Sequence, residues 1–293
     1  MPFFFEEKCE TKWTLQHRFS DLPSPEPFST LAACEDVVPL SAPKLSAHSS
    51  LDSRVNLITM ITSHMLTENR VLCDEIVTLY VGPKHKKFTV HKTLLCDRCE
   101  YFSKAFHGNF KEAQEGVMYL PEDDADTVSS LVYFLYRGTV PKITWESKEL
   151  TRPLRRLYYL AEKLCLSELM DQVIDEISSS IARRNTKLGE LAIRDVYAHT
   201  HEKSKLRLFC SAALVCAVSK GSFFDESWCN KYSAIFSNCP EFFRDMFQFQ
   251  VQHSKAIHEC SSTTGALELA ISFGPCKFHS HERDEECYLK GSK

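Results

Sequence analysis

The C-terminal end of the chain carries residues whose types and spacing suit metal chemistry. Two cysteines and two histidines fall within 12 residues there, namely Cys276, His279, His281 and Cys287. Two thiolates and two imidazoles are a donor set for tetrahedral zinc, and Cys-x-x-His is a workable chelating spacing. Because four protein ligands leave no position for water, such a zinc ion would be structural. The sequence therefore predicts a structural zinc site, and no other feature of it requires a cofactor.

The second half of this motif leaves an alternative open. The spacing from His281 to Cys287 is less usual for zinc, and His258 and Cys260 are substitute ligands. The surrounding residues have mixed charge and no helical or strand period. A charged, disordered end whose cysteines have no ligand role therefore remains an alternative interpretation.

A second cysteine pair, Cys96-Asp97-Arg98-Cys99, has the spacing of a redox motif. A reactive pair needs its first cysteine at an exposed helix N-terminus. Here Cys96 falls inside a predicted helix, and Cys99 shares the apolar stripe of that helix. Buried packing is the favoured interpretation. The chain has 13 cysteines, an odd and scattered set that excludes a complete disulfide framework and indicates a reducing, intracellular compartment, cytoplasmic or nuclear.

Composition narrows the functional classes. The 293 residues carry a formal net charge of -4, so no basic field exists to attract nucleic acid directly. Uncharged stretches such as Leu208–Ser219 are far shorter than the roughly 20 residues that cross a bilayer, so no membrane association is expected. Walker A, dinucleotide-binding, His-Glu-x-x-His and nucleophile-elbow motifs do not occur, and we expect no enzyme.

The N-terminal half of the chain is predicted to contain a tail, a small sheet and helices. Ser20–Ser53 is rich in serine and proline, and residues 1–50 are expected to be a disordered tail. A β-prone run at 76–81 and an alternating run at 88–90 predict a hairpin around 82–86. A helix is expected over 95–106, where the apolar residues follow one stripe.

Beyond residue 120 the chain is predicted to be helical. After a short strand at 117–120, a helix capped by Asp123 or Asp124 ends at Gly138, where a left-handed residue belongs. Residues 154–181 are helical with a break at 166–167, and further helices follow. Because strands and helices do not alternate regularly, the fold class is α+β.

The order of these elements resembles a BTB/POZ domain, most closely the large branch found in filamentous fungi. The resemblance covers Glu75–Val140 through the pieces VTLYVG, FTVHK, YFSKAF, FKEAQEG, LPEDD and LVYFLYRG. With the flanking helices it predicts a BTB/POZ domain over 52–181, a helical C-terminal region over 188–251, and a tail with the Cys/His zinc knuckle over 252–293.

The resemblance implies a non-enzymatic protein-interaction module that forms homodimers. The dimer contact would use the helix before the first strand, whose apolar positions are Leu57, Ile58, Ile61 and Met65. Many such domains are substrate adaptors that bring a client protein to a cullin-based ubiquitin ligase.

The family's cullin contact is a hydrophobic residue, any residue, then glutamate, which Phe110-Lys111-Glu112 matches. An exposed aromatic side chain can fill a partner pocket while a carboxylate at the rim sets the register. The alternative is that Phe110 covers the core and Glu112 is only solvated.

A central groove is a second implied binding site. Asp74 and His91 resemble the charged pair that lines this groove in the family. The competing interpretation of His91 is a histidine that satisfies hydrogen bonds at a strand end. The alternative function is a nuclear or transcriptional regulator that recruits partners without a DNA-binding domain of its own.

Overall fold

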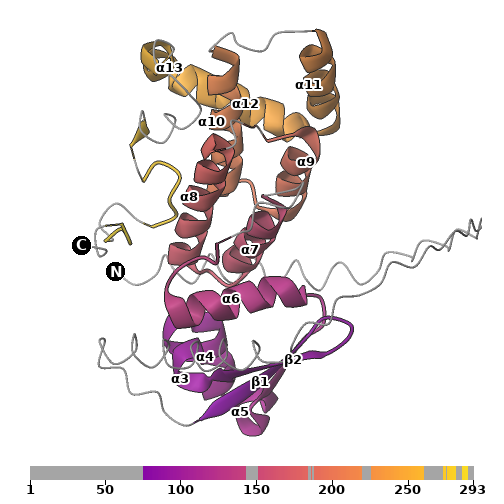
Figure 1. Ribbon diagram of the computed structural model, residues 1–293, viewed down its shortest axis with the longest axis vertical. Helices are drawn as coiled ribbons and strands as arrows, with labels where there is room; N and C mark the ends of the chain where they lie inside the picture. Colours follow the sequence, from indigo (N-terminus) through magenta and orange to yellow (C-terminus); the bar gives the residue numbers. More distant parts are fainter. Residues whose placement is uncertain are drawn as a thin grey trace, which may run out of the picture. The chain divides into compact units, whose positions relative to one another are not determined.

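The computed structural model describes residues 75–142, 151–183, 186, 188–219, 226–260, 273–274, 276–281 and 286–289 (Figure 1). The chain divides into two units, Met1–Asn69 and Arg70–Lys293, and the described residues all belong to the second unit. The predicted tail at 1–50 and the predicted dimer helix therefore lie outside the described residues. That helix carries Leu57, Ile58, Ile61 and Met65.

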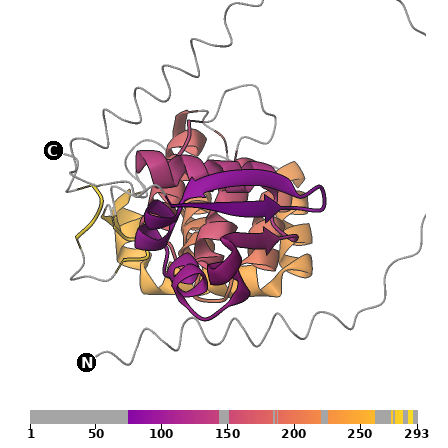
Figure 2. The same cartoon turned by 90° about the horizontal axis from the view of Figure 1, so that it is seen from below.

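The described strands form a small mixed sheet in the order β2-β1-β3 (Figure 2). Strand β1 (Ile76–Val81) pairs antiparallel with β2 (Lys86–His91), which confirms the predicted hairpin. Gly82 opens its turn at φ +70, a conformation that glycine adopts without steric cost. Strand β3 (Val117–Leu120) pairs parallel with β1. Alternation in β1 buries one face of the sheet, on which Val77, Leu79 and Val81 are each at most 1% exposed.

The predicted helix over 95–106 is wrong in one respect, because two helices share its apolar stripe. Helix α3 (Lys92–Arg98) ends before Cys99, whose extended backbone is the N-cap of α4 (Glu100–His107). The thiol of Cys99 contacts the carbonyl of Leu164 at 3.8 Å, so the break is anchored in the core. The apolar pattern predicted burial correctly but could not locate this bend. Leu95, Cys99, Phe102 and Phe106 are all buried.

A short helix, α5 (Lys111–Glu115), precedes β3, and α6 (Ala125–Arg137) follows it. The predicted cap of α6 is confirmed, since the carboxylate of Asp124 accepts the backbone N–H of Thr127 at 3.0 Å. Gly138 ends α6 at φ +69, as predicted. The predicted break near 166–167 separates α7 (Arg152–Lys163) from α8 (Ser167–Arg183).

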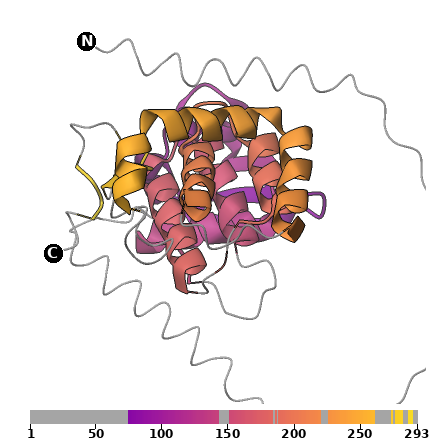
Figure 3. The same ribbon diagram turned by 90° about the horizontal axis from the view of Figure 1, so that it is seen from above.

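The C-terminal helices pack around one central helix. Helix α10 (Lys205–Ser219) contacts α9 (Glu190–His199), α12 (Pro240–Gln252) and α13 (Ser254–Cys260); Figure 3 shows α12 beside the end of α10. Helix α11 (Glu226–Asn238) contacts α9 and α12. Helix α11 lies within the helical region predicted over 188–251, whereas α13 was not expected and lies inside the predicted tail at 252–293. No helix in the described part of the chain is both long and apolar enough to span a bilayer.

Candidate functional site

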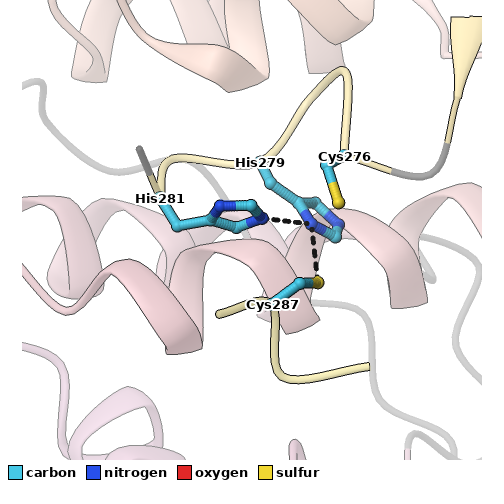
Figure 4. A group of neighbouring side chains, drawn as sticks. All are labelled: Cys276, His279, His281 and Cys287. Atoms are coloured by element: carbon cyan, nitrogen blue, oxygen red, sulfur yellow. Dashed lines mark hydrogen bonds between the residues drawn. The ribbon is translucent and has the colours of Figure 1, made fainter. Parts of the chain in front are cut away.

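The four predicted zinc ligands come together in the structure. One ligand atom from each of Cys276, His279, His281 and Cys287 lies within 4.8 Å of the others, and the side chains point toward one another (Figure 4). The Nδ1 atom of His279 lies 3.4 Å from Nε2 of His281 and 3.5 Å from Sγ of Cys287. Zinc bonds of 2.0–2.3 Å in a tetrahedron place ligand atoms about 3.3–3.8 Å apart. The group therefore has the composition of an S2N2 site, and both distances from His279 Nδ1 fall in the range expected for a tetrahedral one.

Helix α8 supports this group from outside. The Nε2 atom of His279 lies 3.1 Å from Oδ2 of Asp175, and the hydroxyl of Tyr288 donates to the same oxygen. One turn earlier, Asp171 accepts the backbone N–H of Ser280 at 2.5 Å. Asp171 and Asp175 are four residues apart on one helix, so their carboxylates lie on the same face. This face of α8 therefore holds both described stretches of the Cys/His segment, residues 276–281 and 286–289.

Apolar packing also holds the Cys/His segment in place. Phe278 is 3% exposed and makes an edge contact with Phe209 of α10. The backbone turns at Cys276, where the N–H of His279 bonds to its carbonyl at 3.2 Å. This turn brings the first cysteine and the first histidine to the same side. The stretches 276–281 and 286–289 are thus packed against α8 and α10.

The surroundings change the pKa of two of these groups. Partial burial opposes ionisation of the Cys287 thiol, but hydrogen bonds from the Leu289 backbone and from the Cys276 and His279 side chains bring its pKa below the ordinary value. Burial by itself lowers the pKa of His279, whereas the hydrogen bond to Asp175 and the charge of that carboxylate raise it above the ordinary value. The environment of Cys287 therefore favours the thiolate, which is the form that binds metal ions.

The predicted cullin-contact residues lie at the start of α5. Phe110 is the N-cap of this helix and is 59% exposed, so the structure contradicts the interpretation that Phe110 covers the core. Glu112 lies in the first turn of the helix and is half-buried. The ring of Phe110 rests against Gly108, where an added Cβ would lie 2.8 Å from Cδ2 of the ring. The absence of a side chain at Gly108 thus leaves room for the ring.

The groove candidates are only partly described. His91 ends β2, and its Nδ1 lies 2.7 Å from the hydroxyl of Tyr136, which also lies 3.3 Å from the His91 backbone nitrogen. These bonds match the structural role that the sequence offered as a competing interpretation. Asp74 lies outside the described residues, so its pairing with His91 stays a prediction.

The Cys-x-x-Cys motif is part of the core. Cys96 is 5% exposed and Cys99 is 1% exposed, and burial raises the pKa of the Cys96 thiol. A buried thiol with a raised pKa is a poor nucleophile. The prediction of packing over redox chemistry is therefore confirmed for Cys96.

Sequence reasoning missed the acidic residues that hold the Cys/His segment. Asp171 and Asp175 lie more than 100 residues before their partners in the segment, with separations of 109 and 104 positions. The available signal was weak, since two acidic residues four apart on a helix are normally solvent-exposed. The unusual feature is that Asp171 is only 1% exposed.

Comparisons with known proteins identify the class of domain. The model of the BTB/POZ domain family matches residues 64–181. Residues 64–181 of this chain are therefore a BTB/POZ domain, a protein-interaction module, and the predicted α+β class is confirmed.

Two individual proteins are similar to part of this chain. Kelch repeat and BTB domain-containing protein 7 of Homo sapiens is 29% identical over 142 residues, which is 47% of this chain. The chain spans only 19% of the length of that relative. The solved structure of the BTB domain of human gigaxonin is similar over 46% of this chain and 99% of that domain, with 13% identity and a TM-score of 0.29.

Proposed function

We propose that this protein is a non-enzymatic, homodimeric scaffold and a substrate adaptor for a cullin-based ubiquitin ligase. The BTB/POZ domain supplies the interaction module, and the helices after 188 support it or bind the client protein. The observation that carries the cullin assignment is the exposure of Phe110 at the start of α5.

The arrangement around Phe110 suits a partner pocket. The side chain of Phe110 is 59% exposed, so a partner that covers it would remove apolar surface from water. This burial would favour docking. Glu112 follows within the same turn and can form a charged contact at the rim. Interface energy concentrates in a few such anchors, and the loss of one typically costs about 2 kcal/mol or more.

A binding measurement with purified cullin scaffolds tests this proposal. We expect Phe110→Ala with Glu112→Ala to weaken binding about 30-fold or more, which corresponds to about 2 kcal/mol. The matched control is Phe247→Ala with Glu241→Ala on α12, where Phe247 is 58% exposed. Equal binding by the Phe110/Glu112 variant and the wild type would remove these residues from the contact. Loss of binding in the control as well would indicate a general defect.

The self-association part of the proposal has its own test. The helical spacing of Leu57, Ile58, Ile61 and Met65 predicts an apolar dimer stripe. We expect light scattering to give a dimer mass for the wild type and a monomer mass for Ile58→Asp with Ile61→Asp. A dimer mass in both proteins would place the contact elsewhere. Nuclear enrichment of the full chain without cullin binding would favour the alternative function of a nuclear regulator.

A further inference from the structure

The donor atoms of the Cys/His group determine which metal ion it can bind. Thiolate and imidazole donors suit zinc, whereas magnesium and calcium require oxygen ligands. The carboxylates of Asp171 and Asp175, which lie beside the group on α8, already form hydrogen bonds with the segment itself. Two thiolates balance the charge of a divalent ion, and their protons pass to solvent when the ion binds.

The orientation of the His279 ring also points to a metal. Its Nε2 faces the carboxylate of Asp175, so Nδ1 is the atom directed at His281 and Cys287. Zinc-bound histidines almost always donate their other ring N–H to such an acceptor, which fixes the tautomer and the ring orientation. A carboxylate, a histidine and the centre of the donor group thus lie in the order found in zinc proteins.

We propose that Cys276, His279, His281 and Cys287 bind one zinc ion and that this ion clamps the C-terminal segment onto α8, with Asp175 as the positioning residue. The ion joins two short stretches, 276–281 and 286–289, that have few buried side chains of their own. Only Phe278, His279 and Cys287 are buried among the described residues of these stretches. The clamp therefore makes the docking of the segment depend on zinc.

The consequence is a metal-dependent link between two regions of the sequence. Helix α8 contains the end of the BTB/POZ match at residue 181, and the segment follows the last described helix, α13. The segment also contacts α10 through Phe278. Zinc would hold the helical C-terminal region and the BTB/POZ domain together through this segment. This inference does not rest on the cullin assignment, which concerns α5.

Metal analysis of the full chain, purified with a reductant and without chelators, tests the ligands. We expect about one zinc per chain in the wild type and none in Cys276→Ser with Cys287→Ser. The control, Cys165→Ser, changes an exposed cysteine outside the group and should keep one zinc. Zinc content unchanged by the double substitution would overturn the site.

The role of Asp175 is tested by measuring zinc affinity, which should not change if Asp175 only supports the fold. We expect Asp175→Asn to keep the stoichiometry but to weaken zinc binding about 10–100-fold in competition with a chelator. The cobalt-substituted wild type should show the absorption bands of a tetrahedral site with thiolate ligands. Unchanged affinity in Asp175→Asn would remove its positioning role.

Hydrogen exchange then tests the clamp itself. The amide of Ser280, bonded to Asp171, should be protected in the zinc form and exchange faster after chelation. Equal protection in the two forms would show that packing alone docks the segment. That result would overturn the clamp even where zinc is bound.

Discussion

The imidazole of His279 is bonded through Nε2 to the carboxylate of Asp175, a residue 104 positions earlier in the chain, at 3.1 Å. The side chain of His279 is fully buried, and that of Asp175 is 32% exposed. A buried polar ring must find partners for both nitrogens, because an unsatisfied one costs about 1–3 kcal/mol. Asp175 satisfies one nitrogen, and the other nitrogen faces Cys287 and His281. This pairing relates the Cys/His segment to α8, the final helix of the BTB/POZ match.

The first prediction concerns metal removal. We expect a chelator to lower the midpoint of thermal unfolding of the wild type, since a ligand that binds only the folded state stabilises that state. The Cys276→Ser variant should show no further decrease when the chelator is added. Scanning calorimetry with and without chelator measures both effects. A chelator effect of the same size in the variant would mean that the stabilising ion binds elsewhere.

The elements around this site differ in how well the sequence predicted them. Local signals were sufficient for α6, because Asp124 and Gly138 are capping residues at the correct spacing. The spacing of the Cys/His group likewise predicted which four side chains would meet. Asp175 could not be predicted, because its role depends on how α8 and a segment 104 positions later pack together. Cys99 illustrates the same limit, since an apolar pattern marks burial and not a bend between two helices.

The second prediction concerns Gly108 beneath the ring of Phe110. A Cβ at this position would lie 2.6 Å from the backbone oxygen of Lys104 and 2.8 Å from the Phe110 ring. Since the backbone oxygen cannot move without disturbing α4, we expect Gly108→Ala to cost about 1–3 kcal/mol and to displace the ring. Urea denaturation measures the cost. The control is Gly189→Ala, whose Cβ meets nothing within 4 Å and which should change stability by less than about 1 kcal/mol. Equal effects of the two substitutions would contradict the steric argument.

The third prediction concerns the cap of α6 and its pH dependence. Asp124 accepts bonds from the backbone N–H and the hydroxyl of Thr127 at 3.0 and 2.8 Å. Partial burial opposes ionisation, but these bonds and the charge of Arg156 bring the pKa of Asp124 below its ordinary value. A lowered folded-state pKa stabilises the fold above the unfolded-state pKa of about 4, and this stabilisation is lost as the pH falls through the folded-state pKa.

We therefore expect Asp124→Ala to cost about 1 kcal/mol at neutral pH, and the difference from the wild type should shrink as the pH falls below about 4. Asp124→Asn keeps a capping oxygen but loses the charge beside Arg156, so at neutral pH it should cost less than Asp124→Ala but more than nothing. Denaturant unfolding of the three proteins over pH 3–7 provides the measurement. A cost for Asp124→Ala that does not change across this range would show that the ionised carboxylate contributes nothing beyond the cap.

The last prediction concerns an ion pair that joins the BTB/POZ match to the helices after it. Arg155 of α7 donates through Nε to Asp195 of α9 at 3.0 Å, and its side chain is only 6% exposed. The hydroxyl of Tyr159 donates to the same carboxylate oxygen at 3.0 Å. Removal of one partner from a buried pair leaves an uncompensated charge, which typically costs 3–5 kcal/mol.

Because the side chain of Asp195 is 31% exposed, water can partly replace it, and we expect Asp195→Ala to cost about 2–3 kcal/mol. Tyr159→Phe removes one hydrogen bond and leaves the ion pair, so it should cost only about 1 kcal/mol. Denaturant unfolding of both variants ranks the two effects. If Asp195→Ala costs no more than Tyr159→Phe, the charge of Arg155 is compensated by other groups. The hydrogen bond from Arg155 to the hydroxyl of Thr151, at 2.7 Å, would then be the next contact to test by substitution.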